Sequence, residues 1–249
     1  MVAFDSDILI FADTASLDDI KRIADDPYVS GFTTNPSLMK AAGITDYEKF
    51  AKEAIEWLNV NRPDTCLSLE VFADDFDEMY DQADEIDSWI REYDNYMTYV
   101  KIPITNTKGE SSHDLIHRLA LEGINVNVTA VFTEDQGFHA LEAFQNTTTP
   151  GIVSVFAGRI ADAGVNPKRV IKPIRHYRHA MGLDQVQLLW ASTRQPYSVF
   201  EAKKVGCDII TLSPAMIEKM NLFGKDLGEF SLETVNQFYQ DAVSSGYSI

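Results

Sequence analysis

Residues 99–132 decide the fold, and they read YVKIPITNTKGESSHDLIHRLALEGINVNVTAVF. The stretch opens with a short apolar, β-branched run at Tyr99–Ile104 and closes with another at Val126–Phe132. Between the two runs, Asp114–Glu122 carries apolar residues at helical spacing. Two such runs joined by a helix-sized segment predict two parallel strands with a crossover helix, because a tight turn cannot connect parallel strands.

The same alternation recurs along the whole chain. The predicted strands are Ile8–Ala12, Gly31–Thr34, Cys66–Phe72, Tyr99–Ile104, Val126–Phe132, Ile152–Ala157, Gln187–Ala191 and Asp208–Leu212. The predicted helices are Ser16–Asp25, Asp46–Asn59, Asp75–Glu92, Asp114–Glu122, Thr133–Asn146, Lys168–Met181, Pro196–Val205 and Pro214–Met220. Eight such units in 249 residues predict an α/β protein with a single (β/α)8 TIM barrel domain over residues 1–249. An open doubly wound sheet is the alternative, but the sequence lacks both the dinucleotide glycine fingerprint and the P-loop.

One more amphipathic segment, residues 231–246, follows the eighth unit. It predicts an additional C-terminal helix with Leu232, Val235 and Phe238 on its apolar face. Such a helix can pack on its own barrel or on a neighbouring subunit. The pattern leaves both arrangements open.

Composition and charge limit the classes of partner. With 45% hydrophobic side chains the chain can bury a sizeable core, while a net charge of −17 disfavours nucleic acid. No apolar run is long enough to span a bilayer, and the acidic start Met1–Asp7 lacks the basic region of a secretory signal. We therefore expect a cytoplasmic protein with no nucleic-acid or membrane partner. Cys66 and Cys207 lie in apolar runs, which predicts reduced, buried thiols.

Polar residues at the C-terminal ends of the predicted strands need an explanation, because these ends form the active site of a barrel. Asp13, Glu70 and Lys101 each interrupt an apolar run, which is costly unless the charge is paired or functional. Further polar candidates at the strand ends are Thr33, Asn35, Asn127, Thr129, Ser154, Arg159, Ser192 and Arg194. Singly, Asp13 reads as a helix cap, and Glu70 with Lys101 as a structural ion pair. Taken together at the ends of one barrel, the set favours a catalytic site.

An amine beside carboxylates suggests carbonyl chemistry. A desolvated lysine condenses with a ketone, and the resulting iminium accepts electrons when a carbon–carbon bond breaks. A carboxylate is then needed to move the hydroxyl proton. This chemistry requires no cofactor and no metal.

Blocks of residues at the predicted strand ends resemble a known family. The blocks are Phe11–Ala15, Gly31–Leu38 (GFTTNPSL), Tyr99–Thr105 (YVKIPIT), Glu122–Thr129, Ser154–Ile160 and Ala191–Arg194. In this order, and as far as Leu212, the chain resembles the transaldolases and fructose-6-phosphate aldolases. The Thr-Thr-Asn-Pro-Ser and Lys-Ile-Pro blocks are the most specific parts of the likeness. The resemblance implies a barrel enzyme of carbohydrate metabolism that acts on sugar phosphates and forms a homo-oligomer.

The resemblance also implies a role for each candidate residue. Lys101 would form the Schiff base with C2 of a ketose, and Asp13 would be the acid/base at the C4 hydroxyl. Glu70 and Thr129 would hold the catalytic water. The remaining implied contacts are Asn35, Asn127 and Ser154 with the dihydroxyacetone hydroxyls, Arg159 and Arg194 with phosphate, and Thr33, Phe156 and Ser192 with the pocket wall.

Two positions separate the branches of this family. Glu70 and Phe156 stand where the aldolases that release dihydroxyacetone carry glutamine and tyrosine, so both favour a transaldolase. An aldolase with the same Schiff base is the alternative, as is a relative acting on a modified, for example sulfonated, ketose. Thr193 stands between Ser192 and Arg194, where the family usually has an aromatic residue. The resemblance therefore does not decide which group binds at the phosphate end. A catalytically silent barrel is a third hypothesis, which the intact set of Asp13, Glu70, Lys101 and Thr129 disfavours.

Overall fold

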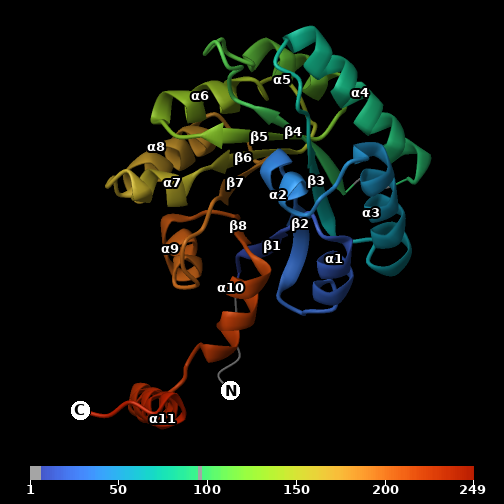
Figure 1. Ribbon diagram of the computed structural model, residues 1–249. Coiled ribbons are helices and arrows are strands. Elements are labelled where there is room, and N and C mark those ends of the chain that lie inside the picture. Colours follow the sequence, from blue (N-terminus) through green and yellow to red (C-terminus); the bar gives the residue numbers. More distant parts are fainter. Residues whose placement is uncertain (1–6, 95–96) are drawn as a thin grey trace.

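The barrel is closed in the computed structural model, which describes residues 7–94 and 97–249 (Figure 1). Its strands are β1 (Leu9–Asp13), β2 (Val29–Thr33), β3 (Cys66–Glu70), β4 (Thr98–Pro103), β5 (Val126–Val131), β6 (Gly151–Val155), β7 (Val186–Trp190) and β8 (Ile209–Leu212). All pair in parallel in chain order, and β1 pairs with β8 to complete the ring. The predicted (β/α)8 barrel is confirmed, with no predicted strand end displaced by more than two residues. Of the acidic N-terminal segment, only Asp7 lies within the described residues.

The helices are α1 (Leu17–Ile23), α2 (Pro36–Ala41), α3 (Tyr47–Asn61), α4 (Phe76–Glu92), α5 (His113–Leu121), α6 (Glu134–Glu142), α7 (Ala157–Asp162), α8 (Pro167–Ala180), α9 (Ser198–Val205), α10 (Pro214–Lys219) and α11 (Leu227–Ser245), with a 3-10 turn η1 (Met220–Leu222). Most helices lie around the ring of strands, whereas α2 lies in front of its centre in this view and α11 lies away from it (Figure 1). Every predicted helix is present, although α6 ends four residues before the predicted end. The sequence pattern did not predict α2 and α7.

Both unpredicted helices are six residues long and follow a strand directly. A helix this short shows no repeating apolar face, so periodicity cannot reveal it. Asn35 caps α2 by accepting from Leu38 N, and Pro36 occupies the first turn, where a missing N–H costs nothing. Ala157, predicted as the end of the sixth strand, instead begins α7. The two helices turn the chain sharply at the rim of the barrel.

The barrel interior consists of an apolar layer beneath a polar one. Phe11, Tyr99 and Ile152 belong to a separate buried cluster contributed by the strands. Side chains two residues apart in a strand share a face, so each of these residues places the polar residue two positions later on the same inner face. Those polar residues are Asp13, Lys101 and Ser154. The alternation of each strand therefore points the candidate site residues inward.

The two cysteines are free and buried, as the sequence predicted. Cys66 lies in the interior cluster, where burial raises the pKa of its thiol to about 11. Burial also raises the pKa of the Cys207 thiol. Both thiols are therefore protonated packing groups at neutral pH.

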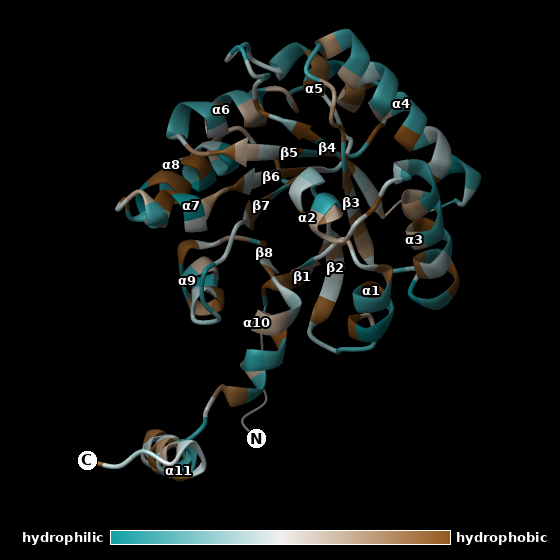
Figure 2. Ribbon diagram, viewed as in Figure 1, coloured by the Kyte–Doolittle hydropathy of each residue, from teal (hydrophilic) through white to brown (hydrophobic). Residues whose placement is uncertain are grey.

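The last helix, α11, projects away from the barrel (Figure 1). It begins four residues before the predicted start, because Asp226 accepts from Gly228 N and Glu229 N and so caps an earlier turn. None of its residues is buried, and Phe238 and Val235 are 67% and 58% exposed. In Figure 2 this helix carries both hydrophobic and hydrophilic residues and lies apart from the barrel. The helix thus does not pack on its own barrel. No helix within residues 7–94 and 97–249 combines the length and apolar character needed to cross a membrane.

Candidate active site

Ten of the twelve residues singled out from the sequence line one cavity at the C-terminal rim of the barrel. The cavity has a volume of about 490 Å³. The ten residues are Asp13, Thr33, Asn35, Glu70, Lys101, Thr129, Ser154, Phe156, Arg159 and Ser192. The other two, Asn127 and Arg194, are not part of its wall. These side chains come from strands β1 to β6, from the segments that follow β2, β6 and β7, and from helix α7.

Lys101 is the buried cation of this cavity. Its Nζ lies 2.8 Å from Glu70 Oε2 and donates to the carbonyl of Thr34 at 2.7 Å. Glu70 and Lys101 are register partners on β3 and β4, so the pairing of these two strands fixes their proximity. Lys101 is only 5% exposed, whereas an ordinary lysine extends into solvent. An amine held in this way is protected from water and has a proton acceptor in contact.

Asp13 is the second carboxylate of the cavity. Thr33, its register partner on β2, donates to Asp13 Oδ1 at 2.9 Å. Burial raises the pKa of Asp13, and this effect outweighs the opposing attraction of Lys101 and the Thr33 hydrogen bond. A carboxyl group with a raised pKa is a better proton donor and acceptor near neutral pH than an ordinary one.

Asn127 lies behind the cavity wall. It is fully buried, its Oδ1 accepts from Ser154 Oγ at 2.7 Å, and its Nδ2 donates to Ser68 Oγ at 3.1 Å. The amide thus connects β5 with β6 and β3. Ser154 lines the cavity, and its hydrogen bond to Asn127 orients that hydroxyl. Ser68 was not predicted, since a serine in an apolar strand carries no functional signal of its own.

Two irregular points shape the rim. The β5–β6 register shifts after Val128, and Ala130 has a positive φ of 60°, so the chain bulges beside Thr129. The Thr129 hydroxyl is buried and has no hydrogen-bond partner among the described residues. Ser192 also has a positive φ of 60°, and a Cβ added at Gly158 would lie 1.6 Å from its carbonyl oxygen. Only glycine fits at position 158, and no motif in the sequence predicted this.

The two arginines occupy different surroundings. Arg159 lines the cavity, with its guanidinium 5.5 Å from the centre of the Phe156 ring. Arg194 donates through Nε and Nη2 to Asp162 Oδ2, at 2.9 and 2.6 Å. These bonds lower the pKa of Asp162. Asp162 was missed in the sequence, although its position one helical turn after Arg159 is a usable signal.

Residues 10–248 match the family described as transaldolase/fructose-6-phosphate aldolase. A "Probable transaldolase" of Nitrosopumilus maritimus is 35% identical over 217 residues, or 85% of this chain and 86% of that protein. A "Probable transaldolase" of Lactiplantibacillus plantarum is 34% identical over 210 residues, or 84% and 87% of the two chains.

Solved structures share the fold at low sequence identity. KGPDC from Streptococcus mutans superposes with a TM-score of 0.56 at 10% identity, covering 85% of this chain and 90% of that one. The 3-keto-L-gulonate-6-phosphate decarboxylase of Vibrio cholerae gives a TM-score of 0.52 at 13% identity, covering 84% and 88%. At these identities the likeness concerns the barrel alone.

The raised pKa of Asp13 can be tested by measuring how the stability of the fold depends on pH. Because the folded pKa lies above the ordinary value of 3.8, Asp13 stabilises the fold at low pH, and this contribution is lost as the pH rises through the folded pKa. We expect Asp13→Asn to be more stable than the wild type at about pH 7, with the difference shrinking toward about pH 4. Urea unfolding at the two pH values measures the difference.

Asp74→Asn is the control of opposite sign. Hydrogen bonds from Thr107 lower the pKa of the Asp74 carboxyl, so this group stabilises the fold above its ordinary pKa. Asp74→Asn should therefore lose stability relative to the wild type as the pH rises. An Asp13→Asn protein that follows the same trend as Asp74→Asn would contradict the assignment of Asp13 as a carboxyl destabilised by burial.

Proposed function

Because the chain belongs to the transaldolase/fructose-6-phosphate aldolase family, we propose that it transfers a dihydroxyacetone unit from a ketose phosphate to an aldose phosphate through a Schiff base on Lys101. The observation that carries the proposal is the buried Lys101 amine, 2.8 Å from Glu70 and in the same cavity as Asp13. One amine and two carboxylates are the groups that imine formation and carbon–carbon cleavage require.

The first step is attack of Lys101 Nζ on C2 of the ketose. The amine must be neutral at that moment, and Glu70 Oε2 is placed to accept its proton. The carbinolamine then takes a proton back and loses its oxygen as water, which leaves the iminium. Thr129 supports this step, because its buried hydroxyl has no protein partner within the described residues and can bind that water together with Glu70.

The second step is cleavage of the C3–C4 bond. The Asp13 carboxylate takes the C4 hydroxyl proton, C4 becomes the aldehyde carbon of the departing aldose, and the bonding electrons move to the iminium to give an enamine. Burial makes Asp13 a stronger base than an exposed carboxylate. These steps run in reverse when the enamine attacks the aldehyde of the incoming acceptor. Asp13 then gives its proton to the alkoxide that forms.

The phosphate end is assigned to the two arginines. Arg159 lines the cavity and forms no ion pair with any described carboxylate, so its guanidinium is available to a phosphate. Arg194 is held by Asp162, and both side chains are about half exposed. A surface pair of this kind contributes little free energy, roughly 0–1 kcal/mol, so a phosphate dianion can compete for the guanidinium.

Assembly is the remaining part of the proposal. The apolar residues of α11 are exposed and lie together on one face, whereas exposed apolar residues on a monomeric protein are normally scattered singly. A helix with no tertiary contacts is marginal in water. We propose that α11 packs on a neighbouring subunit, which makes the enzyme a homo-oligomer.

The function is tested by the release of glyceraldehyde 3-phosphate from fructose 6-phosphate, with and without erythrose 4-phosphate. We expect repeated turnover only when the acceptor is present, because the enamine on Lys101 must be consumed before the next cycle; without the acceptor, release should stop after a single turnover. Sustained release without the acceptor would identify an aldolase, in contradiction to the transferase assignment.

Borohydride trapping with fructose 6-phosphate locates the Schiff base. The wild type and Lys40→Ala should gain the mass of a reduced ketose adduct, since Lys40 lies on α2 outside the site cavity. Lys101→Ala should gain none and should lose activity. A Lys101→Ala protein that is trapped as readily as the wild type would place the amine elsewhere.

Arg194→Ala should raise the KM for the sugar phosphate by about tenfold or more, with a much smaller change in kcat. A hydrogen bond to a charged group contributes roughly 1.5–3 kcal/mol, and this contact is made equally in the bound ground state and the transition state. Steady-state kinetics measure the split. Arg169→Ala on α8 is the control, because it removes an exposed arginine that does not line the cavity, and equal KM values for the two variants would remove Arg194 from the site.

The role of α11 is measured by sedimentation velocity. Phe238→Asp places a charge on the apolar face, so we expect a smaller assembly than for the wild type. Gln240→Asp adds the same charge on the opposite face of the helix and should leave the assembly unchanged. A monomeric wild type, or identical profiles for the two variants, would refute packing through this face.

A further inference from the structure

The backbone carbonyl of Glu70 lies at a gap in the hydrogen-bond ladder of the barrel. A ladder bond between β2 and β3 runs from Thr34 N to Ser68 O, at 3.1 Å. The next donor in a parallel ladder lies two residues further along, which places residue 36 opposite Glu70. Residue 36 is Pro36, which has no N–H, and the chain turns there into α2. The Glu70 carbonyl therefore needs a donor from another element.

Tyr47 provides that donor. Its hydroxyl donates to the Glu70 carbonyl oxygen at 2.9 Å. Tyr47 is the first residue of α3, whose start is fixed by the cap Asp46. The Tyr47 ring lies 5.4 Å from the ring of Phe72 and 6.2 Å from that of Trp89. Packing against these two rings therefore sets the direction of the hydroxyl.

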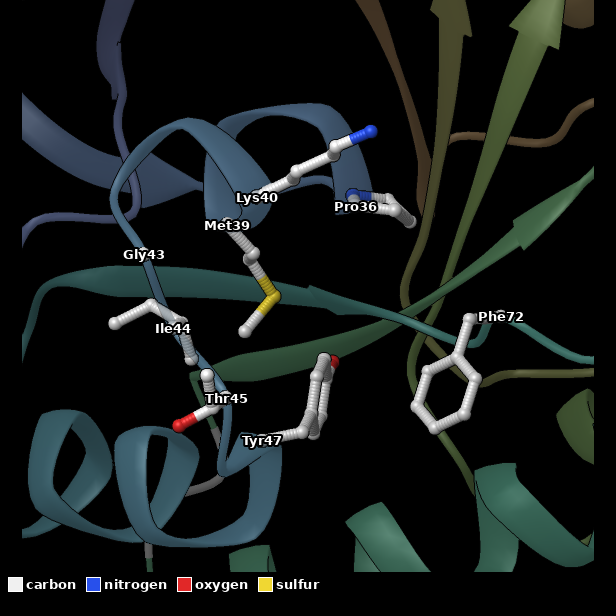
Figure 3. Close-up of a pocket in the computed structure, with 8 residues that line it drawn as sticks. All are labelled: Pro36, Met39, Lys40, Gly43, Ile44, Thr45, Tyr47 and Phe72. Carbon is white, nitrogen blue, oxygen red and sulfur yellow. The ribbon is translucent and has the colours of Figure 1, made fainter.

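The hydroxyl and the ring of Tyr47 lie in different surroundings. The ring borders an apolar cavity of about 370 Å³ on the outside of the barrel, together with Met39 and Phe72 (Figure 3). Tyr47 does not line the cavity that holds Lys101. Burial is the main cause of the raised pKa of Tyr47, so the hydroxyl keeps its proton and remains a donor at neutral pH.

The peptide that follows Glu70 is thus held from both sides. Val71 N donates to Lys101 O at 3.1 Å, while the Tyr47 hydroxyl binds the carbonyl of the same peptide. The Glu70 side chain, attached to this peptide, contacts Lys101 Nζ at 2.8 Å. Any rotation of the peptide would move the carboxylate relative to the amine.

We propose that Tyr47 is a positioning residue that holds the Glu70 carboxylate in register with the Lys101 amine by replacing the ladder donor that Pro36 lacks. The inference rests on the proposed function, in which Glu70 exchanges protons with the amine and the departing water. Tyr47 touches neither the substrate nor the reacting atoms, and acts only through the Glu70 peptide.

Tyr47→Phe tests the inference because it keeps the ring and removes only the hydroxyl. We expect kcat to fall by about tenfold, since small misplacements of reacting groups cost up to about 100-fold. KM should stay within about twofold of the wild-type value, because substrate contacts are untouched. Exchange of the ketose C2 oxygen with ¹⁸O-labelled water should slow in parallel, since imine formation and hydrolysis pass through Glu70.

Tyr177→Phe is the matched control. Its hydroxyl donates to Glu142 at 2.6 Å on the outer helices, so this variant loses one hydrogen bond far from the cavity. It should keep wild-type kcat and oxygen exchange. The inference is overturned if Tyr47→Phe keeps wild-type kcat, if only KM changes, or if Tyr177→Phe loses kcat to the same extent.

A measurement without substrate separates this inference from the proposed function. Reductive methylation with formaldehyde and cyanoborohydride reports the reactivity of Lys101, and mass spectrometry reads it against Lys40 in the same sample. We expect Lys101 to react severalfold more slowly in Tyr47→Phe than in the wild type, because imine formation with formaldehyde also needs Glu70 to accept the proton of the amine. Equal or faster reaction in the variant overturns the positioning role even if the enzyme acts on ketose phosphates. Slower reaction in a chain that traps no ketose supports the positioning role, while the proposed function fails.

Discussion

The buried ion pair between Lys101 and Glu70 is the interaction on which the rest of this structure depends. Placing two charges inside a protein costs several kcal/mol per ion, and the attraction between them offsets this only when their geometry is fixed. The geometry is fixed here by the parallel pairing of β3 and β4, which makes the two residues neighbours, and by the Thr34 carbonyl, which accepts a second hydrogen bond from the amine. A closed barrel suits this task, because no strand has a free edge along which the pair could shift.

The barrel interior has an apolar layer and a polar layer of side chains, and the site occupies the polar one. The lower layer is apolar and excludes water from below, while the polar layer two residues later faces the cavity. This stacking explains why Asp13 has a raised pKa, since its carboxylate stands on the apolar layer and gains only partial compensation from Thr33 and Lys101. A buried carboxyl group of this kind lowers stability at neutral pH and is a stronger proton acceptor than an exposed one, a combination that is common at catalytic positions.

The loops at the rim depend on residues with unusual backbone properties. Pro36 ends the ladder between β2 and β3, which frees the chain to form α2 but leaves the Glu70 carbonyl without a strand partner. Gly158 permits α7 to approach the Ser192 carbonyl so closely that no other residue fits. At both points an irregular backbone lies beside a candidate site residue. The barrel provides the rigid support, and these departures from regular pairing shape the cavity.

The sequence by itself determined the eight strands and the barrel, because alternation in strands and periodicity in helices are local properties of the chain. Polar residues at the strand ends and the motifs shared with a known family also predicted ten residues that line the cavity. Only the tertiary structure decided where Asn127 lies, since its position behind Ser154 depends on the pairing of β5 with β6. The same holds for Arg194, which Asp162 holds 32 residues away in sequence, and for Tyr47, whose partner Glu70 lies on another element. Side-chain contacts between distant segments leave no periodic trace, and the packing of the closed barrel brings them together.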